Sequence, residues 1–265
     1  MLFKELQKII ASIEFYDNKE GWRAFVEHVQ KANPISLPDV HDFQHIKEKA
    51  RTLQWTKMAI GAGWYTRLVK PLPVMVEIMS DIIREREGPA HARAAMGSAL
   101  AYLVQRDDII PENFNGGYGL LDDAIILYYA YYKFMQDQAS RTPELRQSLD
   151  AYCRELESVI KMGLRIFPTS KIDELKEFLS NIAMGFYHLQ EVPTYILEQM
   201  IEQIIQNPEQ NAVNQLLPRL AYHLDVYFPP YNQCAFSDSV LDMVVAMAAE
   251  AGSSLGELTS EGYYY

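Results

Sequence analysis

The sequence contains little of what secreted and membrane-spanning proteins need. Only two of its 265 residues are cysteine, and no Asn-x-Ser/Thr sequence occurs, so neither a disulfide framework nor N-glycosylation is expected. No uninterrupted apolar run approaches the roughly 18–20 residues of a membrane-spanning helix. The opening MLFKELQKII is amphipathic and lacks the basic region and cleavage site of a signal peptide. We therefore expect a cytoplasmic protein and no membrane span.

Basic residues are scarce in the second half of the chain. The formal net charge is −11, and it arises after residue 106, because residues 1–106 are slightly basic. From Glu177 to the end, Arg219 is the single lysine or arginine. A surface of this kind disfavours nucleic acid, whose phosphates it would repel. It predicts a partner protein whose basic surface contacts residues 177–265, or simply high solubility.

No complete catalytic set is recognisable. His41 and His45 stand one helical turn apart, as in several zinc sites, but no third ligand lies nearby. The metalloprotease arrangement would also require glutamate at position 42, where this chain has aspartate. We therefore predict no cofactor, and keep the histidine pair as a secondary candidate for a metal site.

Apolar residues at helical spacing recur along almost the whole chain, as in Leu2, Leu6 and Ile9. Helices are predicted over about 74–87, 90–105 and 120–138, and no segment alternates like a β-strand. The predicted fold is an all-α bundle or paired-helix array, with about ten helices and no significant sheet. Later helices are expected to start near helix-initiating residues, namely Pro143, Thr169, Pro193, Pro208 and Ser237.

The domain organisation predicted from these patterns has four parts. An N-terminal helical region (1–88) precedes a helical hairpin (89–138), and an acidic helical region (139–251) precedes a flexible tail (252–265). Residues 1–251 could equally form one compact domain, because their length suits a single core.

The second helix of the hairpin is apolar or aromatic on every side. Residues 124–132 read AIILYYAYY, so this helix should lie at the centre of a bundle. Its four tyrosines could line a ligand pocket, but we favour amphipathic core residues whose hydroxyl groups reach the rim of the core.

The connection inside the hairpin, DDIIPENFNGGYGLLDDAIIL at 107–127, contains two pairs of adjacent aspartates with a proline and three glycines between them. In a structural interpretation, Asp122 or Asp123 caps the helix that follows, and proline and glycine shape the turn. Asp108 would then be held by one of several arginines. In a functional interpretation, carboxylates from both ends of the turn bind Mg²⁺ or Ca²⁺. The structural set is Asp108, Pro111, Gly119, Asp122 and Asp123; the metal set is Asp108, Glu112, Asp122 and Asp123.

This region resembles the YkvA-like domain family, a bacterial family of unknown function. The resemblance rests on ALAYL at 99–103, DIIPE at 108–112, Gly119 and LLDDAI at 120–125, and extends more loosely over about residues 64–134. The chain departs from the family pattern at Asp107, which is an addition of this sequence. Because the role of the family is not established, the resemblance assigns no activity to the matched residues.

Three functions follow as hypotheses. The first is a non-catalytic adaptor or regulator that binds another protein, which the resemblance links to bacterial stress-response or defence systems, including CRISPR-linked ones. The second is a metal-dependent hydrolase that uses the carboxylates of the hairpin turn. The third is a peripheral membrane protein that docks through an apolar helix. We favour the first, because the sequence shows everything it requires.

Overall fold

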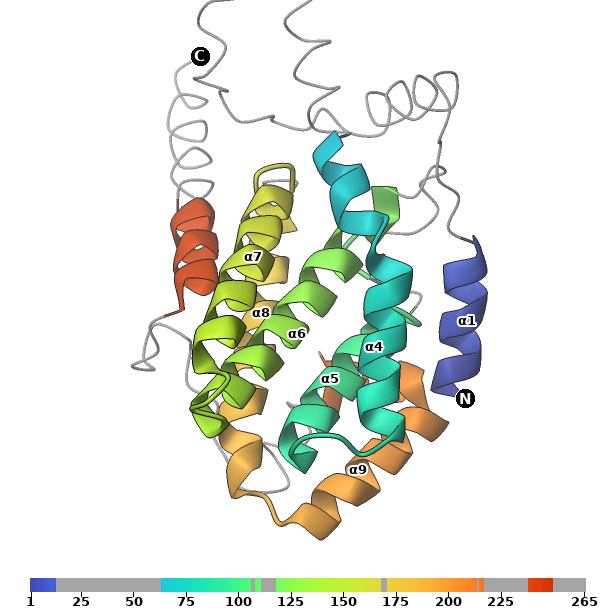
Figure 1. Ribbon diagram of the computed structural model, residues 1–265. Coiled ribbons are helices and arrows are strands. Elements are labelled where there is room, and N and C mark those ends of the chain that lie inside the picture. Colours follow the sequence, from blue (N-terminus) through green and yellow to red (C-terminus); the bar gives the residue numbers. More distant parts are fainter. Residues whose placement is uncertain are drawn as a thin grey trace, which may run out of the picture.

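The computed structural model is a helical bundle (Figure 1). It describes residues 1–12, 63–105, 108–110, 118–167, 171–213, 215–216 and 238–249. No strand occurs within these ranges, so the predicted all-α fold is confirmed. The residues outside them include several that the sequence singled out: His41, His45, Pro111, Glu112 and the tail 252–265.

The helices begin close to the predicted starts. Among the described residues, seven α-helices have these bounds: α1 Leu2–Ser12, α4 Leu72–Arg84, α5 Ala90–Tyr102, α6 Leu121–Arg141, α7 Arg146–Leu164, α8 Ile172–His188 and α9 Thr194–Gln206. Residues 63–69 and 239–249 are also helical. Short 3₁₀ turns lie at η2 Tyr118–Leu120, η4 Leu189–Glu191 and η5 Pro208–Gln210. Near Pro208 the described residues begin with η5 and continue with helical residues 213 and 215–216; the rest of the helix predicted there lies outside the described residues.

Helix α5 is the centre of the bundle. All of its residues from Ala90 to Tyr102 are buried, and it contacts α1, α4, α6, α8 and α9. Its sequence is rich in alanine, which lets neighbouring helices approach closely on every side. A Cβ atom on Gly97 would lie 3.4 Å from Cγ2 of Ile204, so α9 lies directly against this helix.

Helix α6 is the second central element, as its composition predicts. Every residue from Leu121 to Tyr132 is buried, and the helix packs along α5, α7 and α8. The tyrosines lie in the core with polar partners: the Tyr129 hydroxyl donates to Asp238 at 2.8 Å, and the Tyr132 hydroxyl accepts from Gln136 at 2.7 Å. The core interpretation of this aromatic helix is confirmed.

Glycine brings three helical segments together at one point. A Cβ atom on Gly163 of α7 would lie 2.9 Å from Cδ2 of Leu68 and 3.0 Å from Cγ1 of Ile125. Only a residue without a side chain allows α7 to approach both α6 and the helical residues 63–69 this closely. This contact fixes the relative position of α7 and the segment 63–69.

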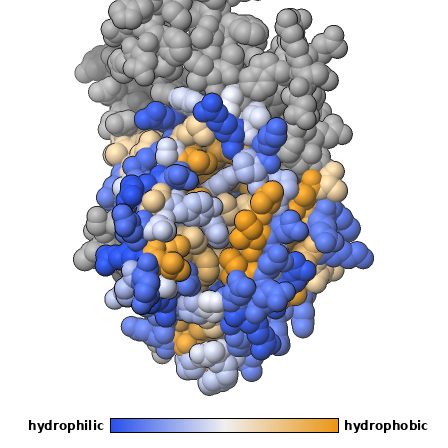
Figure 2. Space-filling model, viewed as in Figure 1, coloured by the Kyte–Doolittle hydropathy of each residue, from blue (hydrophilic) through white to orange (hydrophobic). Residues whose placement is uncertain are grey.

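The visible surface is largely hydrophilic. In Figure 2 apolar side chains gather in small separate patches among polar ones, which is ordinary for a folded domain. The amphipathic α1 packs its apolar face against the bundle, where Leu2 and Leu6 are buried. Within the described part of the chain, no helix has the length and apolar character needed to cross a membrane.

Candidate functional site

The turn between α5 and α6 is built around the carboxylate of Asp122. This side chain is fully buried, and its Oδ2 atom accepts a hydrogen bond from the Tyr102 hydroxyl at 2.7 Å. The same oxygen accepts from the backbone N–H groups of Ile109 and Ile110, both at 3.1 Å. The Ile109 N–H also donates to the Tyr102 hydroxyl at 2.9 Å. One carboxylate thus joins the end of α5, the turn and the start of α6.

The structural interpretation of the motif needs one correction. We expected Asp122 or Asp123 to cap α6, but the N-cap residue is Leu120, which makes no side-chain cap bond. Asp122 instead lies inside the first turn of α6 and bonds back to the preceding segment. Both aspartates still place negative charge near the positive end of the helix dipole.

The other predicted site residues lie around this network. Asp123 is buried beside Asp122, Asp108 is half-buried directly before Ile109, and Gly119 lies in η2. Of the arginines expected to hold Asp108, Arg84 is paired with Asp81 and Arg93 with Glu198. Another of the candidates, Arg106, lies outside the described residues, so an arginine partner for Asp108 stays a prediction.

Burial sets the protonation of this site. Desolvation raises the pKa of Asp122 to about 6, although hydrogen bonds from Tyr102 and from backbone N–H groups oppose the shift. Burial, together with the nearby Asp122 and Asp123 charges, also raises the pKa of Tyr102. At neutral pH the ionised Asp122 carboxylate therefore accepts a hydrogen bond from the protonated Tyr102 hydroxyl, and this bond is charge-assisted.

This arrangement stabilises the hairpin and engages one of the two carboxylate oxygens of Asp122, while Oδ1 is buried without a hydrogen-bond donor among the described residues. Its Oδ2 atom already accepts three hydrogen bonds. Among the residues that the structure describes, no group of three His, Cys, Asp or Glu side chains is placed to hold a metal ion. Glu112 and the pair His41 and His45 lie outside those residues, so their predicted metal roles stay predictions.

The raised pKa of Asp122 predicts a measurable pH dependence. Because the folded pKa of about 6 exceeds the unfolded value, the folded state binds this proton more readily. Lowering the pH from about 7 to about 4 should therefore increase the unfolding free energy of the wild type relative to Asp122→Asn by about 2 kcal/mol. Urea unfolding of both proteins across this range measures the difference. A flat or falling difference would contradict the assignment.

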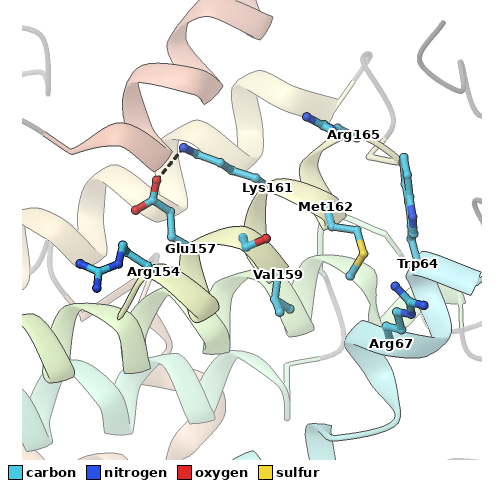
Figure 3. Close-up of a pocket in the computed structure, with 9 residues that line it drawn as sticks. Trp64, Arg67, Arg154, Glu157, Val159, Lys161, Met162 and Arg165 are labelled. Atoms are coloured by element: carbon cyan, nitrogen blue, oxygen red, sulfur yellow. Dashed lines mark hydrogen bonds and ion pairs between the residues drawn. The ribbon is translucent and has the colours of Figure 1, made fainter. Parts of the chain in front are cut away.

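A second feature was not predicted from the sequence. A pocket of about 560 Å³ lies between α7 and the helical residues 63–69, and basic side chains dominate its lining (Figure 3). Arg154, Lys161 and Arg165 follow one face of α7 at helical spacing, which is a signal visible in the sequence. Trp64 and Arg67 complete the pocket from a distant part of the chain, which the sequence pattern does not reveal.

A third feature lies where α8 turns into α9. We define the acidic corner as the exposed residues Tyr187, Glu191, Tyr195, Gln199 and Glu202. Tyr187 is 51% exposed and Tyr195 is 67% exposed, which are high values for aromatic side chains. Tyr195, Gln199 and Glu202 fall on one face of α9, and the turn η4 brings Glu191 to the start of that helix.

These observations define an all-helical bundle whose α5–α6 hairpin is held by a buried carboxylate. The hairpin is also where comparison with known families finds a match. Residues 92–129 match the family described as "Protein of unknown function (DUF1232)", and this segment contains both Tyr102 and Asp122. Comparisons of the chain with curated proteins and with solved structures give no significant match.

Proposed function

We propose that this protein is a non-catalytic adaptor or regulator that binds a partner protein with a basic surface. The acidic corner, at the junction of α8 and α9, is the contact surface in this proposal. It joins two exposed tyrosines to exposed carboxylates, and aromatic residues are enriched in protein interfaces.

The observation that carries the proposal is the pairing of exposed aromatic area with an excess of carboxylates. Tyr187 and Tyr195 expose about half or more of their surface, and no lysine or arginine follows in the chain until Arg219. An excess of carboxylates attracts a basic surface and orients it during encounter. Desolvated tyrosines then supply the contact area that holds a complex together.

The surface is held in a fixed shape before any partner binds. Arg93 of the central helix α5 is buried and forms an ion pair with Glu198, on the same helix as Tyr195. Leu197 and Ile201 bury the opposite face of α9 in the core. A surface that is already ordered loses little conformational entropy on association.

The other two hypotheses have less support. A hydrolase would require the Asp122 carboxylate to bind a cation, whereas its Oδ2 atom already accepts three hydrogen bonds. A millimolar divalent ion that raised the melting temperature would support it. Membrane docking through α6 or α1 would require apolar surface that both helices bury inside the bundle.

The wider setting is also a proposal. We propose that the α5–α6 hairpin is a YkvA-like domain; the match of residues 92–129 to a family of unknown function supports this, because it includes the turn that carries the resemblance. In this view the hairpin is the structural core, and the acidic corner provides the binding specificity of an accessory protein in a bacterial stress-response or defence system. A cytoplasmic location is part of the same proposal.

Affinity capture from the native host, followed by mass spectrometry, tests the adaptor function. The bait is the full chain, and the test variant combines Glu191→Lys with Glu202→Lys in the acidic corner. We expect the wild type to retain a specific partner with a basic surface, and the double variant to bind it at least about tenfold more weakly. A separate Tyr195→Ala variant should weaken the same complex through lost contact area.

A matched control reverses two exposed carboxylates elsewhere. Glu85→Lys with Glu144→Lys makes the same change in net charge at exposed turn positions, one directly after α4 and one between α6 and α7. This control should capture the partner as the wild type does. The proposal is wrong if no partner is specific, or if both charge-reversed pairs weaken capture equally.

A further inference from the structure

The basic pocket has two walls that come from distant parts of the chain. One wall is the face of α7 that carries Arg154, Lys161 and Arg165, and the other is formed by Trp64 and Arg67 of the helical residues 63–69. Figure 3 shows Trp64 and Arg67 on one side and the α7 side chains on the other. The volume of about 560 Å³ lies within the range of about 300–1,000 Å³ that is usual for small-molecule sites.

The arginines of this pocket differ from most others in the described part of the chain. Among the described residues, Arg67, Arg154 and Arg165 have no ion pair with a carboxylate. Four of the five described arginines outside the pocket are paired with an acidic neighbour: Arg84 with Asp81, Arg93 with Glu198, Arg141 with Asp137 and Arg146 with Asp150; the fifth, Arg86, is exposed and has no such pair. The helix dipole favours Arg165 at the end of α7, but it does not explain three unneutralised arginines around one pocket.

Lys161 is the exception within the pocket, because Glu157 neutralises it. Their side chains form an ion pair at 2.6 Å, drawn as the dashed line in Figure 3. Glu157 also accepts a hydrogen bond from the Ser239 hydroxyl at 2.5 Å, which links α7 to the helical residues 239–249. Burial would raise the pKa of Glu157, but the bonds from Lys161 and Ser239 outweigh it and lower that pKa. Glu157 is therefore ionised at neutral pH.

We propose that this pocket binds a nucleoside phosphate. The planar guanidinium groups of Arg67, Arg154 and Arg165 would bind phosphate oxygens, for which their paired N–H groups are well suited. Trp64 offers an aromatic face on which a base can stack. Val159 and Met162 supply apolar contact beside it.

The charge distribution favours a small anion over a long one. The whole chain has a net charge of −11, so a nucleic acid lying across its surface would meet repulsion outside the pocket. A small ligand needs only local attraction, because salt screens charges beyond about 8 Å at physiological ionic strength. The pocket thus lines a small volume with basic side chains, whereas the chain as a whole is acidic.

Isothermal titration calorimetry of the full chain tests the site with ATP and with inorganic triphosphate, at about 0.15 M salt. The wild type should bind both, and ATP at least about fivefold more tightly because of base stacking. Arg154→Gln with Arg165→Gln should weaken both ligands at least about tenfold. Trp64→Leu should weaken ATP and leave inorganic triphosphate unchanged, because it retains apolar packing but removes the aromatic face.

Two further variants sharpen the test. Glu157→Gln removes the one carboxylate among the described residues that line the pocket and releases Lys161, so both ligands should bind about fivefold more tightly. Arg146→Gln is the control, because it removes an exposed arginine from the same helix outside the pocket. The proposal is overturned if ATP does not bind at millimolar concentration, or if the Arg146 control weakens binding as much as the pocket variants. It is also overturned if ATP and inorganic triphosphate respond equally to Trp64→Leu.

Discussion

Replacing Asp122 by alanine should lower the free energy of unfolding by about 3–5 kcal/mol at neutral pH. The substitution leaves the Tyr102 hydroxyl and the Ile110 N–H without their acceptor, and leaves the Ile109 N–H with the Tyr102 hydroxyl alone. Each of these donors is buried, and an unsatisfied buried donor costs about 1–3 kcal/mol. The hairpin between the two central helices should therefore lose its anchor.

Urea unfolding measures this loss, with Asp173→Ala as the control. Asp173 occupies the first turn of α8 as Asp122 does in α6, but it is exposed. Its removal should cost less than about 1 kcal/mol, since only the helix dipole is affected. Tyr102→Phe should cost about 1–2 kcal/mol, and a double-mutant cycle should show coupling with Asp122. An Asp122→Ala variant as stable as the control would refute the structural role.

Replacing Asp238 by alanine should be comparably costly, at about 3–5 kcal/mol. Its carboxylate does two things at once. Oδ1 accepts from the N–H groups of Val240 and Leu241, which caps the helical residues 239–249. Oδ2 accepts from the Tyr129 hydroxyl and from Lys133, both on the central helix α6. Alanine removes the cap and leaves a largely buried lysine without this partner.

The effect of Asp238→Ala should begin locally. Hydrogen exchange of residues 239–249 should increase more than exchange in α5, because the cap and the tether both belong to this segment. Asp238→Asn should retain the cap, which asparagine forms equally well, and so cost less. The control is Asp242→Ala, an exposed position on the same helix. Unchanged exchange in Asp238→Ala would show that packing alone holds this helix.

The sequence predicted the helices because their signals are local. Helix α9 begins directly after Pro193, and α6 occupies the segment that is apolar on all sides, as expected for a central helix. These patterns depend on residues within one or two turns of each other, and burial follows from them without knowledge of the neighbours. The predicted capping by Asp122 failed for the opposite reason, because its backbone partners lie 13 and 12 residues earlier in the chain.

Partners across the bundle could not be read from spacing. Arg93 and Glu198, or Tyr129 and Asp238, are about a hundred residues apart, and nothing in either segment indicates the other. The acidic corner was predicted only as a charge excess over residues 177–265; its exposed tyrosines became visible once α8 and α9 had packed. Amphipathic sequence shows that a face is buried, but not which residue meets it.

The sequence by itself determined that this chain forms helices, that its aromatic helix α6 is buried near the centre and where its most distinctive turn lies. Those properties are set by periodicity, proline and glycine, which act within a few residues. The tertiary structure decided that Asp122 points inward as an anchor, and that Trp64 and Arg67 meet the basic face of α7. The physical reason is that hydrogen bonds, ion pairs and pockets depend on distance in space, which helix packing sets, as the close approach at Gly163 does here.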